Sequence, residues 1–271
     1  MRSPRRLCLL TRHAKAPAIT PALKSVGYVV ESLDGFDTDR LGTFSGEVER
    51  QGSMRDAALA KAKLACSLGK SRFGLGSEGG FGGDPFLGVS AWGRELLVWW
   101  DAEAGYGVEG FVQGPETNWR GIEVSDLESA RSFAGEVVFP SHGIIVGRPG
   151  EAWFTKRCED LDALLQSVER GLVAGTVALQ TDMRAHRNPT RMAMIARAAE
   201  ALAARLSHAC PACDAPGFGP QEAVPGALCE VCGEPTTVAK AEFWRCPRCD
   251  WVEQRPLAQR AKAERCDRCN P

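Results

Sequence analysis

The sequence predicts an α/β fold, with a mixed central sheet flanked by helices, followed by a small C-terminal module that resembles a double zinc ribbon. Near each end of residues 1–206, an apolar segment typical of a strand is followed by a polar turn and then by a segment with helical periodicity. Hairpin patterns lie between them, so the sheet is expected to be mixed. Four C-x-x-C pairs near the C-terminus indicate the zinc module. We therefore expect two domains, residues 1–206 and residues 207–271.

Composition sets the outer bounds. The 271 residues are 44% hydrophobic and carry a formal net charge of −1. They can bury at least one good core, and they produce no global positive field that would attract nucleic acid or anionic lipid. The apolar run Leu7 to Leu10 is too short for a signal peptide, and no segment approaches membrane-spanning length. We expect a cytoplasmic protein with no membrane partner.

The first strand is predicted at Arg6 to Leu10, and a helix follows over residues 17–25. The turn between them carries a hydroxyl, an imidazole and an ammonium group, from Thr11, His13 and Lys15. These groups suit phosphate. A solvated basic turn is the alternative.

A second strand is predicted at Tyr28 to Leu33, and residues 34–50 form a long acidic, glycine-containing stretch without periodicity. Compact domains seldom hold such a stretch unless it is functional. Its acids are candidate Mg2+ ligands, because Mg2+ prefers carboxylate oxygens. They are Asp37, Asp39, Glu47 and Glu49. The alternative is that they only solvate a loop.

Ser53 with Asp56 predicts a capping box and the start of a helix. The segment Phe73 to Pro85 then begins as a strand and runs into six glycines within ten residues. Such glycines allow close approach of a ligand, and Glu78 is the carboxylate near their start. A structural loop is the alternative.

Hairpins are predicted in the middle of the chain. Glu95 to Trp100 is expected to pair with Glu109 to Gln113, and Glu136 to Phe139 with Gly143 to Val146. His142 lies in the second turn, where we expect a structural role rather than a ligand contact. An amphipathic helix begins at Asp160 and ends at Gly171, and a short strand follows at Gly175 to Gln180.

The stretch from Thr181 to Arg191 packs three arginines, a histidine and an aspartate between that strand and a helix that starts at Asn188-Pro189. In α/β sheets, anions collect where strands end and helices begin. Arg184, Arg187 and Arg191 therefore predict an anion site, and phosphate is the expected anion. The alternative is a surface loop whose arginines pair with acids elsewhere.

Cysteine gives the sharpest signal. Eight of the eleven cysteines form four C-x-x-C pairs and are the predicted metal ligands: Cys210, Cys213, Cys229, Cys232, Cys246, Cys249, Cys266 and Cys269. Two pairs complete one tetrahedral site, so we expect two structural Zn2+ ions rather than disulfides. The spacing allows sequential pairing, with 15 and 16 residues between pairs, or a nested arrangement. The remaining cysteines, Cys8, Cys66 and Cys158, are expected to be packing residues.

The whole chain resembles an uncharacterised bacterial family catalogued as a domain of unknown function. The resemblance rests on the four C-x-x-C pairs and on the phrases DTDRLGTFSGEVER, LGSEGGFGGDP, FPSHG and TDMRAHRNPTRM. It brings no known activity.

Residues 1–206 also resemble, remotely, the inosine triphosphate pyrophosphatase-like superfamily, including the Maf proteins. Thr11-Arg12-His13-Ala14-Lys15 is similar to the Thr/Ser-x-Asn-x-x-Lys phosphate turn of that superfamily, although His13 replaces asparagine and the lysine is one residue closer. Lys61-Ala62, Gly76-Ser77-Glu78-Gly79-Gly80 and Ala185-His186-Arg187 follow in the superfamily's order, although its Ser-His-Arg has lost the serine here.

The remote resemblance implies Mg2+-dependent attack of water on a nucleoside triphosphate or a related phosphate compound. Glu78 and Glu47 would hold Mg2+, Asp182 would be a third ligand or the base, and His186 would contact the base or the phosphate chain. The catalytic residues would thus be Glu78, Asp182 and His186. The phosphate- or substrate-binding residues would be Thr11, His13, Lys15, Lys61, Arg184, Arg187 and Arg191.

The alternative function is a noncatalytic zinc protein that binds nucleic acid or protein. From Ser207 to Pro271 the chain has eight Lys/Arg and nine Asp/Glu, and thiolate ligands add negative charge. This net negative charge disfavours binding of nucleic-acid phosphates. The basic residues are nevertheless concentrated in the later part of the segment, so a local basic face that binds RNA is the open alternative. The sequence leaves the oligomeric state open.

Overall fold

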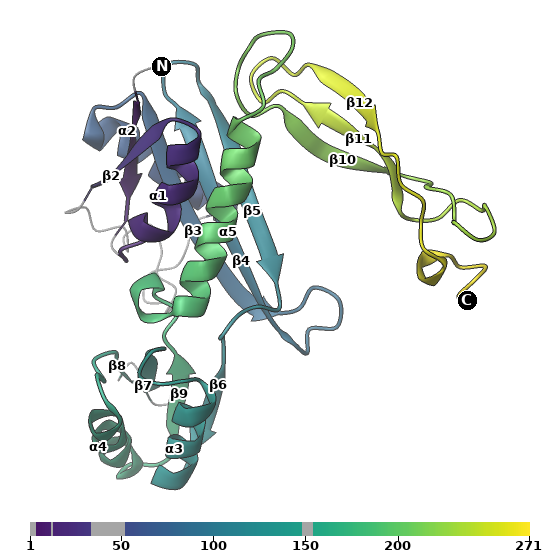
Figure 1. Ribbon diagram of the computed structural model, residues 1–271. Coiled ribbons are helices and arrows are strands. Elements are labelled where there is room, and N and C mark those ends of the chain that lie inside the picture. The colour runs from purple at the N-terminus through teal and green to yellow at the C-terminus, as the bar shows by residue number, and fades with distance from the viewer. Residues whose placement is uncertain (1–3, 12, 34–51, 148–153) are drawn as a thin grey trace.

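The computed structural model describes residues 4–11, 13–33, 52–147 and 154–271. The predicted mixed α/β class is confirmed by a five-stranded sheet with the order β2-β1-β3-β4-β5 (Figure 1). Its strands are β1 (Arg5–Leu10), β2 (Tyr28–Leu33), β3 (Phe73–Gly83), β4 (Ala91–Asp101) and β5 (Tyr106–Gly114). β1 runs parallel to both of its neighbours, whereas β3, β4 and β5 form an antiparallel meander.

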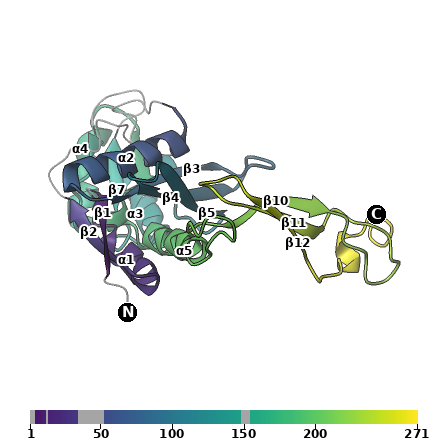
Figure 2. The same cartoon turned by 90° about the horizontal axis from the view of Figure 1, so that it is seen from above.

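Helices cover both faces of this sheet. α2 (Met54–Gly69) packs on one face, and α1 (Ala16–Ser25) and α5 (Pro189–Leu206) pack together on the other (Figure 2). The glycines of β3 allow the close approach of α2, since a Cβ at Gly76 would lie 1.9 Å from the Ala58 carbonyl oxygen. The glycine-rich segment is therefore strand as far as Gly83, where the sequence suggested a strand running into a loop.

The predicted helix starts are confirmed. The hydroxyl of Ser53 accepts a hydrogen bond from the Asp56 backbone N–H, and the Asp56 carboxylate accepts one from the Ser53 N–H. At α5, the Asn188 side chain accepts a hydrogen bond of 2.9 Å from the Arg191 N–H. Both caps satisfy N–H groups that have no partner inside their helix.

A second, four-stranded sheet has the order β6-β9-β7-β8 and lies at one end of the body (Figure 1). Its elements are β6 (Gly121–Val124), α3 (Leu127–Glu136), β7 (Ile144–Gly147), β8 (Phe154–Thr155), α4 (Leu161–Leu172) and β9 (Val177–Thr181). The two helices share a core with these strands, built around side chains such as Phe133 and Leu164.

The strand predicted at Glu136 to Phe139 is wrong. Glu136 is the last residue of α3, which Asp126 caps by accepting a hydrogen bond from the Ser129 N–H. A run of three apolar residues fits a strand or the end of a helix equally well. Burial of Phe133 and Val137 on one helical face decides for the helix.

The C-terminal part forms an arm that projects away from the body in both views (Figures 1 and 2). Its antiparallel sheet contains β10 (Gly219–Pro225), β11 (Ala239–Arg245) and β12 (Val252–Pro256), in that order. The predicted division at residue 206 stays a prediction. Within the described residues, no helix has the length and apolar character needed to cross a membrane.

Candidate functional site

Two groups of four cysteines are the clearest sites in the structure. Cys210, Cys213, Cys246 and Cys249 form one group, and Cys229, Cys232, Cys266 and Cys269 form the other. The first pair of cysteines thus joins the third, and the second joins the fourth. This interleaved pairing is neither the sequential nor the nested arrangement that the spacing suggested, because the sheet β10-β11-β12 carries alternate pairs to its opposite ends.

The sulfur positions fit a tetrahedral metal. Sγ–Sγ distances are 3.7 Å for Cys210–Cys249 and 3.5 Å for Cys232–Cys266, and all four ligand atoms of each group lie within 4.8 Å of one another. A tetrahedral Zn2+ with Zn–S bonds of about 2.3 Å requires Sγ atoms about 3.8 Å apart. Each group can therefore hold one structural metal ion, and four thiolates favour zinc.

Each C-x-x-C pair adopts the same turn. The residue after the second cysteine donates its N–H to the carbonyl of the first, at 2.9 Å for Asp214 to Cys210 and 3.1 Å for Gly233 to Cys229. Asp214 and Gly233 have positive φ, which tightens the turn. Backbone N–H groups from Cys232 and Val231 lower the pKa of Cys229 to about 7, which favours the thiolate that a metal requires.

The two groups differ in their surroundings. Cys210 and Cys246, at the base of the arm, belong to the main hydrophobic core together with Phe218 and Leu202. The cysteines at the tip belong to none of the four apolar clusters formed by the described residues. We call the groups the base site and the tip site.

The three remaining cysteines are buried, as expected of packing residues. Burial raises the pKa of the Cys66 thiol to about 11. A thiol in this state is a poor nucleophile.

A buried cluster of charges lies beyond the carboxyl end of β1. β1 pairs with β3 only as far as Leu75, so β3 continues past it with Ser77 and Glu78. The turn after β1 places the Lys15 Nζ 3.1 Å from the Ser77 Oγ. Lys15 is only 7% exposed. The site therefore lies where β1 ends and β3 continues without β1 as its neighbour.

Two ion pairs act on Lys15, and a third acts on the neighbouring His13 through Arg184. The Lys61 ammonium contacts the Glu78 carboxylate on the α2 face of the sheet. Arg191 Nε lies 2.7 Å from Glu95 Oε1 on the α5 face, and Arg184 binds Asp182 through two of its nitrogens.

Electrostatics link the two faces at this edge of β1. Burial, followed by the charge of Arg191, lowers the pKa of Lys15 to about 7, and Glu78, Glu95 and Lys61 also act on it. The cluster of buried groups is therefore one electrostatic unit around Lys15.

Two histidines complete the cluster. The rings of His13 and His186 are stacked, with centroids 5.3 Å apart. Burial and the charge of Lys15 lower the pKa of His13 to about 3, and burial and Arg184 lower the pKa of His186. The imidazole of His13 is thus neutral at pH 7.

Most of the predicted site residues lie together in this cluster, and Arg187 does not. Thr11 is buried in the same turn, and its hydroxyl accepts a hydrogen bond of 3.3 Å from the His13 N–H. Arg187 points elsewhere, since it binds Glu159 at 3.1 Å and the Cys158 carbonyl at 2.9 Å. The sequence predicted no role for Ser77 or Glu95. The only feature that could have drawn attention to Glu95 is the position of an acidic residue in an otherwise apolar strand.

His142 has the structural role expected of it. Its Nε2 lies 2.9 Å from the Thr190 hydroxyl, and its Nδ1 lies 3.2 Å from the Ser141 hydroxyl. It therefore joins the turn before β7 to the start of α5.

The described acids do not fit the expected Mg2+ site. Glu78 is paired with Lys61 and Asp182 with Arg184, so a cation faces each carboxylate. Among the described residues, only the two cysteine groups bring three or more metal-ligating side chains together. The four acids of the long loop, Asp37, Asp39, Glu47 and Glu49, lie outside the described residues.

Comparison with known proteins identifies the family. A family model described as a domain of unknown function (DUF6671) matches residues 61–271. The chain belongs to this family. No curated protein and no solved structure matches it.

The DUF6671 match covers both groups of four cysteines and the two partners of the Lys61–Glu78 ion pair. Lys15 and His13 precede the match. The buried cluster therefore combines side chains from the matched region with side chains from the first strand-to-helix turn.

Proposed function

We propose that the cluster around Lys15 binds the phosphate groups of a nucleotide or a related phosphate compound, and that the protein hydrolyses this compound. The observation that carries the proposal is the charge balance of the cluster. Lys61, Arg191 and Arg184 each face a carboxylate, whereas the hydrogen-bond partner of the buried Lys15 ammonium is the uncharged Ser77.

Among the described residues none forms an ion pair with Lys15, although Glu95 and Glu78 act on it from farther away. A buried ammonium without such a pair is unfavourable, because burial removes its hydration. A phosphate oxygen beside Lys15 would supply the missing negative charge and a strong acceptor. Arg184 is 29% exposed and can turn a nitrogen toward the same anion while Asp182 holds it. The site therefore favours an anion with several oxygens.

The neutral histidines supply acid–base chemistry. Water attacks phosphorus, its proton passes to an unprotonated ring nitrogen of His186, and the bond to the leaving phosphate oxygen breaks. His13, whose pKa is about 3, is the weaker base and stacks on His186. Lys15 and Arg184 neutralise the charge that develops on the phosphoryl oxygens. Asp182 and Glu78 act as positioning residues in this scheme, since each one holds a cation.

The resemblance to the inosine triphosphate pyrophosphatase-like superfamily supports the same substrate class and remains a prediction. Because the described acids are paired with cations, no step of the proposal passes through Mg2+. Domain organisation enters the proposal as well: residues 1–206 would carry the chemistry, and residues 207–271 would bind zinc.

Phosphate release from a panel of standard and deaminated nucleoside triphosphates tests the proposal. The zinc-loaded chain is compared with Lys15→Met and with the matched control Lys63→Met, whose lysine is exposed on α2. We expect turnover of at least one nucleotide, a loss of about 100-fold or more in Lys15→Met, and normal turnover in the control.

The panel is run with and without Mg2+, so that a metal requirement is measured rather than assumed. Silence across the panel rejects hydrolysis. Equal activity of Lys15→Met rejects this cluster as the site.

A further inference from the structure

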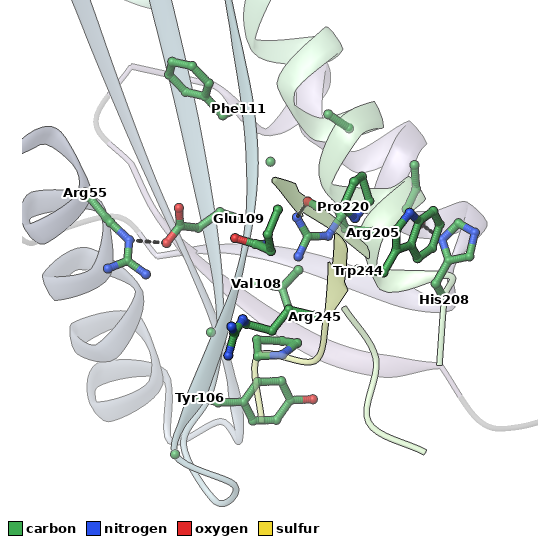
Figure 3. Close-up of a pocket in the computed structure, with 17 residues that line it drawn as sticks. Arg55, Tyr106, Val108, Glu109, Phe111, Arg205, His208, Pro220, Trp244 and Arg245 are labelled. Carbon is green, nitrogen blue, oxygen red and sulfur yellow. Dashed lines mark hydrogen bonds and ion pairs between the residues drawn. The ribbon is translucent and has the colours of Figure 1, made fainter. Parts of the chain in front are cut away.

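A groove of about 960 Å3 lies between the body and the arm. One wall is the edge of β5 and the C-terminal turns of α5, and the other wall comes from β10 and β11 (Figure 3). Seven consecutive residues, from Gly105 to Phe111, line it. Side chains of β5 alternate between the two faces of the sheet, so an uninterrupted run in one groove means that the strand's edge itself borders the space.

β5 is a free edge of the five-stranded sheet. In the part of the chain that the structure describes, no segment hydrogen-bonds to its outer side. Every second residue of an edge strand points its N–H and C=O outward. The nine residues of β5 contain no lysine or proline, the residues that commonly protect such edges.

The charge of the groove is positive. Three arginines, Arg55, Arg205 and Arg245, line it, and its carboxylate, Glu109, is already paired with Arg55 (Figure 3). The Arg205 guanidinium donates to the carbonyls of Gly217 and Pro220. Arg245 is half exposed, 3.6 Å from the exposed Asp250.

Apolar surface accompanies this charge. Phe111 is 45% exposed, and Trp244 lies on the opposite wall (Figure 3). A bound chain would therefore find backbone partners along β5, apolar contacts at Phe111 and Trp244, and cations at Arg55 and Arg245.

We propose that this groove binds an extended acidic peptide segment of another protein, which adds to the edge of β5 as a sixth strand. Backbone pairing along β5 supplies affinity, and acidic side chains beside Arg55 and Arg245 supply selectivity. Six of the seven consecutive groove residues, Tyr106 to Phe111, belong to β5 and offer a docking length of about 20 Å at 3.3 Å per residue.

A peptide fits these observations better than a nucleic acid. A nucleic acid lacks the alternating N–H and C=O groups with which a peptide pairs along a strand edge. The arm's acids also outnumber its bases by nine to eight before thiolate charge is counted. An acidic peptide uses both the edge and the local arginines. This inference is independent of the proposed phosphate chemistry.

A random heptapeptide phage library, selected on the zinc-loaded full chain, tests it. We expect acidic, β-branched, proline-free peptides to be selected. The best peptide is then measured by fluorescence polarisation, and we expect Arg245→Glu and Arg55→Glu each to weaken binding about tenfold. Arg260→Glu, an exposed charge reversal on the same arm outside this groove, should leave affinity unchanged.

Two further measurements address the mode of binding. N-methylation of alternate peptide amides should abolish binding if the peptide joins β5, because it removes donors and leaves the side chains intact. Hydrogen exchange should show slowed amides in β5. Zinc content is measured in each variant, since Arg245 precedes the base-site ligand Cys246.

Several results would overturn the proposal. These are selection of no peptides, selection of neutral or basic peptides, unaltered binding after N-methylation, or protection elsewhere than in β5. Displacement of the peptide by single-stranded RNA would assign the groove to nucleic acid. Concentration-dependent dimerisation in ultracentrifugation, with β5 protected, would assign it to a second copy of the chain.

Discussion

The two cysteine groups and the Lys15 cluster are opposite solutions to the same electrostatic problem. Each cysteine group gathers four side chains that become negative on deprotonation, and a divalent cation would complete it. In the described part of the chain, the Lys15 cluster pairs three cations with three carboxylates and contains one further cation, the buried Lys15 ammonium. The cysteine groups require a cation, and the Lys15 cluster requires an anion. In each region, the sign of the uncompensated charge determines the sign of the ligand.

The two regions also differ in how they depend on the fold. The cysteine turns are local, because two residues separate the ligands of each pair. The Lys15 cluster draws its side chains from the first turn, α2, β3, β4 and the approach to α5. Loss of a cysteine ligand should therefore affect mainly the residues packed around that metal site. A substitution in the Lys15 cluster should change how the stability of the whole body depends on pH.

The largest expected effect follows loss of the base site. Cys246→Ser removes a ligand that also belongs to the main core, so we expect the free energy of unfolding to fall by about 4 kcal/mol and the zinc content to fall from two to one. Chemical unfolding and metal analysis measure this. Cys158→Ser, a buried cysteine outside both groups, should keep two zinc ions.

A smaller effect is expected from pH. The pKa of Lys15 is about 7 in the folded chain and near its ordinary value of 10.5 when unfolded, so the unfolded chain binds more protons between these pH values. The free energy of unfolding should rise by about 2–3 kcal/mol from pH 7 to pH 9, relative to Lys15→Met. Below pH 7 both states are protonated, and the cost of the buried charge is fully present.

The measurement is the difference between urea unfolding of the wild type and of Lys15→Met at each pH, with Lys63→Met as the control. Because methionine removes the buried charge, Lys15→Met should be more stable than the wild type at pH 7. Parallel pH curves for the two proteins would contradict the assignment of Lys15 as an uncompensated buried cation.

Sulfate offers a third comparison, because its charge does not change near neutral pH. At ten times its Kd, it should stabilise the wild type by about 1.4 kcal/mol at pH 6. The stabilisation should weaken as pH rises above 7, since Lys15 loses its proton. Differential scanning fluorimetry across sulfate concentrations measures it, and an equal gain in Lys15→Met would show that sulfate binds elsewhere.

The smallest effect on the body is expected from the tip site. Cys266→Ser should also lose one zinc ion, yet it should change the unfolding of the body by less than about 1 kcal/mol, because the tip cysteines lie outside the main core. Hydrogen exchange should locate the change in residues 227–238 and 257–271, and not around the base-site ligands Cys246 and Cys249. An effect on the body equal to that of Cys246→Ser would remove the distinction between the two sites.

Signals in neighbouring residues made much of the fold predictable. The capping pair Ser53 and Asp56 and the Asn188-Pro189 start each rest on contacts within one helical turn. The strand predicted after Glu136 was wrong because three apolar residues do not distinguish a strand from a helix end. Structure that depends on contacts within one helical turn is therefore the part of the fold that the sequence predicts.

The candidate sites follow the same division. The cysteine ligands were visible at once, whereas their pairing depends on which residues β10, β11 and β12 bring to each end of the arm. The role of Glu95 was hidden, since it becomes apparent only when α5 places Arg191 beside it. The Lys61–Glu78 contact likewise requires α2 to pack on β3.

Interleaving of the cysteine pairs has a consequence for synthesis on the ribosome. The base site lacks its last ligand until Cys249 has emerged, and the tip site lacks its last ligand until Cys269 has emerged. A nascent or prematurely terminated chain that ends before Cys266 keeps Cys229 and Cys232 as an open half-site. Metal loading at the tip therefore reports that translation has passed Cys269.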